Sequence, residues 1–208
     1  MTEIGLDRLG AKRDNRIYAK SRIIELLQVG FAGRRWQKQT GPFCRAQLAH
    51  MEFFMHQQAM QELNERFRRQ IPLTDHLGLR ISAWDGDRLR MAAPLAPNRN
   101  DKGTGFAGSI ASLATFAGWA LLTLAVEERC GAAQVAVYRS ELRYRRPIDG
   151  DFEARCCLPD AAQMEEFWQA LRDTGRGRLE LNVVVVQGDE EKVRYQGAYA
   201  VRLVAGLD

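Results

Sequence analysis

The chain has 208 residues, 46% of them hydrophobic and 27% charged, which is typical of a globular protein and argues against a disordered one. Residues 1–57 contain ten Lys/Arg and five Asp/Glu, or +5, whereas residues 58–208 contain twenty and twenty-one, or −1, and together these give the net charge of +4. The basic character therefore belongs to the first quarter. Because that charge is diffuse and has no arginine cluster, it favours a solvated segment over an arm that binds nucleic acid or an anionic surface.

Residues 1–57 are predicted to form an N-terminal extension that is weakly ordered or partly helical. One amphipathic helix is expected around residues 17–29, where isoleucine and leucine recur unevenly. The sequence that follows has no period, and Met51, Met55 and Met60 lie just ahead of the better-patterned region. Two explanations stay open: translation begins at one of these methionines, or the segment is a poorly ordered appendage.

Residues 58–206 are predicted to form one domain. A helix is expected over residues 59–70 and is ended by Pro72. Alternating apolar residues on both sides of Asp85 and Gly86 then predict a β-hairpin.

The stretch from residue 100 to residue 128 organises this domain. It opens with polar and glycine residues and then runs from Gly103 to Val126 without a charge, which predicts a helix buried on all sides. The run is long enough to span a membrane. Its content of Gly, Ser, Thr and Ala, together with strands that need a core, favours a buried helix, so no membrane span is expected.

Four strands with one helix between them are expected after Gly131. In the strand over residues 135–145, one face is predicted to carry Ala136, Tyr138, Ser140, Leu142 and Tyr144. A strand from residue 152, a helix from its N-cap Asp160 to Gly175, and two final strands follow. This order predicts an α+β fold in which a curved antiparallel sheet wraps around the long central helix.

Cysteines and histidines indicate neither a disulfide framework nor a metal site. Cys156 and Cys157 are neighbours on a predicted strand, so their side chains point to opposite faces. The three histidines lack the spacing of zinc ligands, and no cofactor is expected. The N-terminal sequence has no apolar core of a signal peptide, which predicts a reduced, cytoplasmic protein.

Three sequence blocks carry a resemblance to a known family: PLTDHLGL at 72–79, APLAPNRNDKGTGFAGS at 93–109, and SELRYRRPIDGD at 140–151. Over residues 59–204 the chain resembles the hotdog-fold thioesterase superfamily, in particular the putative thioesterase domain of the YiiD C-terminal type. The resemblance implies a hotdog fold and hydrolysis of acyl thioesters of coenzyme A or acyl carrier protein. It also implies a homodimer or a dimer of dimers.

The resemblance further implies site residues. In the related phenylacetate-pathway thioesterases, the turn before the helix carries an Asn, a Gly and then His-Gly-Gly, with an acidic residue two to three turns into the helix. Asn100 and Gly103 match this pattern. The histidine position holds Phe106, the two glycine positions hold Ala107 and Gly108, and the acidic position falls at Thr115. A threonine hydroxyl cannot act as a carboxylate base at neutral pH, so the family's base assignment does not carry over.

The start of the central helix suits an oxyanion. The first N–H groups of a helix have no intrahelical acceptor and carry partial positive charge, so those of residues 106–108 are candidate donors to a thioester carbonyl. Gly108 would let the substrate approach the backbone. The alternative is that the glycines only allow close packing of helix and sheet.

Asp101 is the candidate base because it is the nearest carboxylate, and Asn100 is a candidate for orienting the attacking water or binding the thioester carbonyl. The alternative for both is a structural role in the turn. Thr115 faces the site if the family register holds and is otherwise part of the core. Ser140 and Tyr138 are expected to line the cleft from the partner subunit, with core packing as their alternative.

Three arginines at the end of the strand predicted over residues 135–145 are candidates for binding the phosphates of coenzyme A: Arg143, Arg145 and Arg146. The alternative is a solvated outer face paired with Glu141.

Competing functions stay open at this point. The leading hypothesis is an acyl thioesterase, and the alternative is a hotdog domain that binds acyl thioesters, or simply dimerises, without turnover. A membrane-attached protein that uses residues 103–126 is a third possibility. Hydration or dehydration of enoyl thioesters usually needs an Asp–His pair, and no histidine lies near the turn.

Overall fold

Residues 42–204 are described by the structure, a computed structural model. They belong to the unit Gly41–Asp208, and the helix predicted over 17–29 lies outside the described residues. The elements in chain order are α2 (Pro42–Gln70), α3 (Pro72–His76), β1 (Arg80–Trp84), β2 (Arg88–Ala93), the 3-10 helix η1 (Ala96–Asn98), α4 (Ala107–Cys130), β3 (Ala133–Tyr144), β4 (Phe152–Cys157), α5 (Ala161–Thr174), β5 (Arg176–Gln187) and β6 (Glu190–Leu203).

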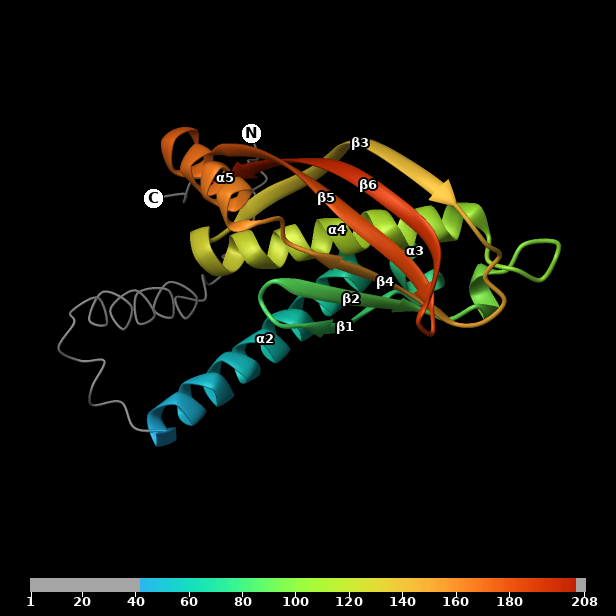
Figure 1. Ribbon diagram of the computed structural model, residues 1–208, viewed down its shortest axis with the longest axis horizontal. Coiled ribbons are helices and arrows are strands. Elements are labelled where there is room, and N and C mark those ends of the chain that lie inside the picture. The colour runs from blue at the N-terminus through green and yellow to red at the C-terminus, as the bar shows by residue number, and fades with distance from the viewer. Residues whose placement is uncertain (1–41, 205–208) are drawn as a thin grey trace, which may run out of the picture. The chain divides into compact units, whose positions relative to one another are not determined.

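The six strands form one antiparallel sheet in the order β1-β2-β4-β5-β6-β3. The sheet curves around α4, which runs along its concave side (Figure 1). This arrangement confirms the predicted α+β hotdog fold. β3 is one edge of the sheet and β1 is the other.

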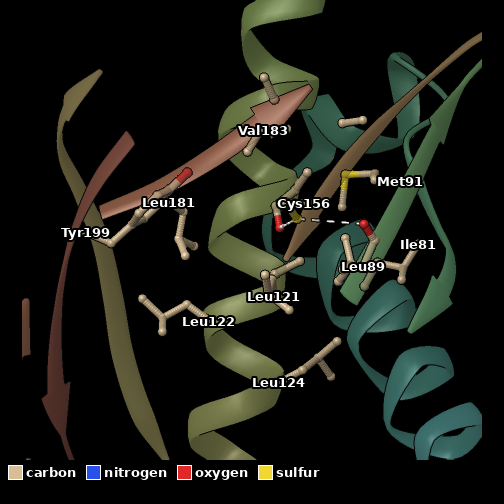
Figure 2. Packing of buried hydrophobic residues seen from close by; sticks show 14 of the residues in the cluster. Ile81, Leu89, Met91, Leu121, Leu122, Leu124, Cys156, Leu181, Val183 and Tyr199 are labelled. Atoms are coloured by element: carbon tan, nitrogen blue, oxygen red, sulfur yellow. Dashed lines mark hydrogen bonds between the residues drawn. The ribbon is translucent and has the colours of Figure 1, made fainter. Parts of the chain in front are cut away.

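α4 lies in the core because nearly every side of it meets apolar side chains. Leu113, Ala117 and Leu121 are fully buried, and Figure 2 shows Leu121, Leu122 and Leu124 between strands from both halves of the sheet. α4 is long and apolar enough to cross a membrane, but 72% of its most apolar window is buried inside the domain. Packing at the centre of this core therefore accounts for the apolar character of α4.

α2 begins earlier than the helix expected over 59–70. It starts at Pro42 and runs without a break across the domain boundary predicted at residues 57–58. Its last three turns bury Met60, Leu63 and Phe67. The side chain of Asn64 donates to the carbonyl of Ile81 at 3.1 Å and accepts from the Ile81 N–H at 2.8 Å, so α2 also satisfies part of the β1 edge.

A β-bulge in β3 changes which side chains face inward. Val137 lies opposite Tyr199 of β6, but Arg139 lies opposite the very next residue, Ala198, so Tyr138 is an extra residue in the strand. For the residues that follow the bulge, the predicted inward face is correct, because Leu142 packs on the core. For the residues that precede the bulge, the prediction is wrong, because Val135 packs on the core in place of Ala136.

Candidate active site

The residues that hold the start of α4 come from all three of the sequence blocks that carry the family resemblance. Asn98 is 1% exposed, and its side-chain amide donates to the carbonyl oxygens of Leu77 at 2.8 Å and Pro94 at 2.7 Å. The carbonyl of Asn98 accepts from the N–H of Phe106 at 2.7 Å. Asn98 therefore ties the first block to the turn that enters α4, although the sequence analysis did not select it.

The third block supports the same turn. Ile148, which is 1% exposed, accepts a hydrogen bond at its carbonyl from the N–H of Gly105 at 2.7 Å. Asp151 accepts at Oδ1 from the N–H of Leu95 at 2.8 Å. Residues more than forty positions apart in sequence therefore fix the backbone that leads into α4.

Asn100 shapes the turn over residues 100–105 with its own side chain. Its Oδ1 accepts from the N–H groups of Lys102 at 2.9 Å and Thr104 at 3.1 Å, and its Nδ2 donates to Oγ1 of Thr104 at 3.0 Å. Gly103 has a positive φ of 79°, a conformation that favours glycine. The structure thus places Asn100 and Gly103 as residues that position the helix start.

Asp101 lies on the surface of this turn. Its side chain is 77% exposed, and its carboxylate pairs with Nζ of Lys102 at 2.9 Å. The turn extends away from the sheet beside the start of α4 (Figure 1). The structure therefore leaves the carboxylate of Asp101, the candidate base, in solvent.

Free donors are present at the first turn of α4. Phe106 is the N-cap residue and provides no side-chain cap, and the helix has no acidic residue in its first turn. The sequence analysis proposed the N–H groups of residues 106–108 as donors, and this is wrong for Phe106, whose N–H already donates to the carbonyl of Asn98. The first N–H with an intrahelical acceptor belongs to Ile110, which donates to the carbonyl of Phe106 at 3.0 Å. Within residues 42–204, no acceptor binds the N–H groups of residues 107–109. These groups and the helix dipole can stabilise a developing oxyanion.

Two aromatic rings border these donors. Phe106 is 53% exposed, and its ring lies so close to Gly108 that a Cβ atom there would be 2.5 Å from it. From the end of β3, the hydroxyl of Tyr144 donates to the carbonyl of Ala107 at 3.0 Å, and partial burial raises the pKa of Tyr144. The sequence analysis put Tyr144 on the same strand face as Leu142 but gave it no role at the site, because its contact with α4 depends on the packing of distant elements.

Thr115 lies on the one strip of α4 that the sheet does not cover. Gly108, Ser112, Thr115 and Trp119 share a helix face by their spacing, and all four retain some exposure. The residues buried along α4 lie mainly on its other faces. Trp119 donates from Nε1 to the carbonyl of Val135 at 2.7 Å, so this face looks toward the β3 edge. Seven residues separate Gly108 from Thr115, which corresponds to about 10 Å along the helix.

A buried tyrosine ties the backbone of α4 to the sheet at Thr115. The hydroxyl of Tyr199 donates to the carbonyl of Thr115 at 3.0 Å and lies 3.1 Å from the hydroxyl of Tyr195. Burial raises the pKa of Tyr199. Tyr199 occupies the space left by the missing side chain of Gly118. The local sequence does not reveal this pair, because the contact joins β6 to α4 across 84 positions.

Each of the three candidate phosphate-binding arginines pairs with a glutamate. Arg143 contacts Glu141 at 2.9 Å, Arg145 contacts Glu191 at 3.1 Å, and Arg146 contacts Glu190. Between 50% and 73% of the surface of each arginine side chain is exposed to solvent. Exposed ion pairs contribute on the order of 0 to 1 kcal/mol, so phosphate groups can compete with these glutamates.

The sheet register separates Tyr138 from Ser140. Tyr138 is the bulge residue, and its ring is 5.5 Å from the guanidinium of Arg178. Ser140 is exposed and lies opposite Gly197 of β6. Ser140 also borders a shallow hollow whose other lining residues are Arg139, Glu141, Glu180, Gln196 and Ala198.

Comparison with known proteins gives a consistent result. Residues 60–203 match the model of a family described as putative thioesterase, yiiD C-terminal type. A protein of unknown function from Chlorobaculum tepidum is 28% identical with a TM-score of 0.67, over 72% of this chain and 97% of that one.

Two further solved structures share the fold. A putative thioesterase from Shewanella oneidensis is 22% identical with a TM-score of 0.65, over 71% of this chain and 99% of that one. A thioesterase from Haemophilus influenzae is 16% identical with a TM-score of 0.56, over 72% and 94%.

Proposed function

The chain belongs to the putative thioesterase family of the yiiD C-terminal type, and on this premise we propose that it hydrolyses an acyl thioester of coenzyme A or of acyl carrier protein. One observation carries the proposal beyond family membership. The start of α4 presents three unpaired N–H groups within the described part of the chain, and residues from all three sequence blocks fix their position. Such donors contribute on the order of 3 kcal/mol to stabilisation of an oxyanion.

The reaction requires water, and the helix supplies the charge stabilisation. Water attacks the thioester carbonyl carbon, a C–O bond forms, and the carbonyl electron pair moves to oxygen, where N–H groups of residues 107–109 bind it. As the carbonyl re-forms, the C–S bond breaks and the thiolate leaves. A base accepts a proton from the attacking water, and the thiolate takes up a proton to become the free thiol.

A second copy of the chain completes the site in this proposal. Thr115 is about two helical turns from Gly108 on the same helix, too far for both to contact one reacting carbonyl. A partner's α4 that packs against the exposed strip could bring its own Thr115 to these donors. The uncovered β3 edge supports the same arrangement, because Val137 and Tyr138 are 39% and 54% exposed there and unpaired strand edges favour association. We therefore propose a homodimer or a dimer of dimers, with Ser140 near the shared cleft.

The arginine group supports a coenzyme A carrier. Arg143, Arg145 and Arg146 flank the end of β3 at Tyr144, whose hydroxyl contacts the first turn of α4. The cationic side chains therefore lie within two residues of a tyrosine that contacts the segment of the oxyanion donors. Their weak pairing with surface glutamates allows exchange for phosphates.

The alternative function is binding of an acyl thioester without turnover. Two observations favour it: the histidine position of related enzymes holds Phe106, and Asp101 is solvated and paired with Lys102. Asp101 is the candidate base under the enzymatic proposal. Asn100 then acts as a positioning residue, because its amide is engaged within the turn.

An assay of free thiol release with acyl-CoA substrates of different chain length tests the proposal. We expect release above background for at least one chain length and a ten-fold or larger loss in Asp101→Asn. Asp87→Asn, at an exposed carboxylate in the β1–β2 turn, is the matched control and should retain activity. Absence of release for every acyl chain, with substrate binding still measurable by calorimetry, would support the binding function.

A further inference from the structure

Three arginines at the start of β5 and the end of β6 project from one face of the sheet. Arg176 and Arg178 lie on either side of the buried Gly177, and successive side chains of a strand point to opposite faces. Arg202 of β6 lies directly opposite Arg176 and therefore shares its face. Because α4 runs along the concave side of the sheet (Figure 1), these exposed arginines project from the convex side.

Directly opposed arginines occur three times among the described strands, and only one of these pairs lacks a carboxylate partner. The pairs are Arg90–Arg155, Arg143–Arg194 and Arg176–Arg202. In the first pair Arg155 contacts Glu153, and in the second each arginine contacts a glutamate of its own. Within residues 42–204, no carboxylate contacts Arg176 or Arg202. The positive charge of this pair is therefore uncompensated there.

Arg178 adds a third guanidinium beside the pair. It is two residues from Arg176 on the same strand face, which separates the two Cα atoms by roughly 7 Å. Its guanidinium lies 5.5 Å from the centre of the ring of Tyr138, and across the sheet it faces the small side chain of Ala200. A cation–π contact orients a guanidinium and leaves its N–H groups available to an anion.

The opposed pair works against the sheet unless an anion lies between the two side chains. Like charges directly opposite each other on neighbouring strands destabilise a sheet. The Cα atoms of opposed residues are only about 5 Å apart, so Arg176 and Arg202 can reach the same anion. Guanidinium groups bind phosphate oxygens in a bidentate geometry. One phosphate can therefore bridge this pair, and Arg178 can bind a second phosphate linked to the first.

We propose that Arg176, Arg178 and Arg202 bind a ligand with two or three linked phosphates, supplied as inorganic pyrophosphate or as a nucleotide. Within one chain, this site is separate from the arginines proposed to bind coenzyme A. Gln134 of β3 lies opposite Arg202, and ten residues lead from it to Tyr144 at the other end of the strand, or about 30 Å. The inference concerns a second anionic ligand and does not depend on the proposed thioesterase activity.

Isothermal titration calorimetry of the full chain tests this inference, with sodium pyrophosphate and ADP as the probes. We expect saturable binding that weakens when salt is raised from about 0.05 to about 0.5 M. The double variant Arg176→Gln/Arg202→Gln should bind at least ten-fold more weakly. The matched control Arg90→Gln/Arg155→Gln removes another opposed pair and the same charge, and it should bind as the wild type does. Tighter binding of ADP than of pyrophosphate would identify a nucleotide as the ligand, and equal binding would identify the inorganic ion.

Urea unfolding provides a second measurement. Without ligand, Arg176→Gln/Arg202→Gln should be at least as stable as the wild type, because it removes a repulsion between like charges. Pyrophosphate should raise the urea midpoint of the wild type and of the control, but not that of the double variant.

Three outcomes would overturn the inference. They are absence of binding by both probes at low salt, an equal loss of affinity in the two double variants, and preference for a single-stranded oligonucleotide over both probes. The last outcome would assign the arginines to nucleic acid. Release of thiol from acyl-CoA should be unchanged in Arg176→Gln/Arg202→Gln, so this test and the test of the proposed function fail independently.

Discussion

Substitution of Gly118 by alanine probes how tightly α4 is held against the sheet. A Cβ atom at Gly118 would lie 2.8 Å from Cζ of Tyr199 and closer still to its hydroxyl oxygen. Tyr199 is fully buried, and its hydroxyl donates to the carbonyl of Thr115. The added methyl group must therefore displace a buried ring and its hydrogen bond.

Opposing effects determine how much Gly118→Ala changes the free energy of unfolding. Alanine is better than glycine in a helix by about 1 kcal/mol. Overpacking of a core costs about 1 to 3 kcal/mol, and a buried hydroxyl that loses its partner costs a further 1 to 3 kcal/mol. The sum predicts that Gly118→Ala lowers the free energy of unfolding by about 3 kcal/mol, whereas helix propensity alone predicts a gain.

Urea unfolding followed by tryptophan fluorescence, at one fixed protein concentration, measures this change. The variant Tyr199→Phe removes the hydroxyl, so Gly118→Ala should cost less in that background than in the wild type. A Gly118→Ala protein at least as stable as the wild type would refute the packing argument. Equal costs in the two backgrounds would show that the hydroxyl of Tyr199 is not the group that is displaced.

Three further predictions concern stability and reactivity. Asp160→Ala should lower the free energy of unfolding by about 1 kcal/mol, measurable by urea unfolding, because the Asp160 carboxylate accepts from the N–H groups of Ala162 and Gln163 at the start of α5. In the native protein at pH 8, iodoacetamide should label exposed Cys157 well before Cys156, as peptide mass spectrometry can show, because burial raises the pKa of the Cys156 thiol. Above about pH 10, the urea midpoint should fall with rising pH, because unfolded tyrosines release protons that Tyr199 keeps in the folded state; Tyr199→Phe should flatten this dependence.

Elements with a strong local signal could be predicted from the sequence. An uncharged run from Gly103 to Val126 predicts a buried helix because no polar face is available for solvent, and the structure confirms it as α4. Asp160 and Gly175 mark the ends of α5 correctly, because capping depends on residues within one turn. The hairpin of β1 and β2 follows from its turn and its alternation in the same way.

Features that depend on distant contacts could not be predicted. The bulge at Tyr138 has no signal of its own in the strand and is set by the register of β3 on β6. Tyr144 and Tyr199 reach α4 only through that register. Arg143 pairs with Glu141, the partner that the sequence analysis named. The partners of Arg145 and Arg146 are Glu191 and Glu190 of β6, more than forty positions away.

The two longest helices after the hairpin differ at their N-termini, and the difference bears on function. α5 has a side-chain cap in Asp160, whereas α4 has Phe106 at its N-cap and no acidic residue in its first turn. A capping side chain typically stabilises a helix by about 1 kcal/mol, and a nearby carboxylate adds about 0.3 to 1 kcal/mol through the helix dipole. Either group would also occupy the N–H donors of residues 107–109. The chain thus forgoes helix stability at the one end where free donors are useful to an acyl thioester, and this supports the proposal that they bind its carbonyl oxygen.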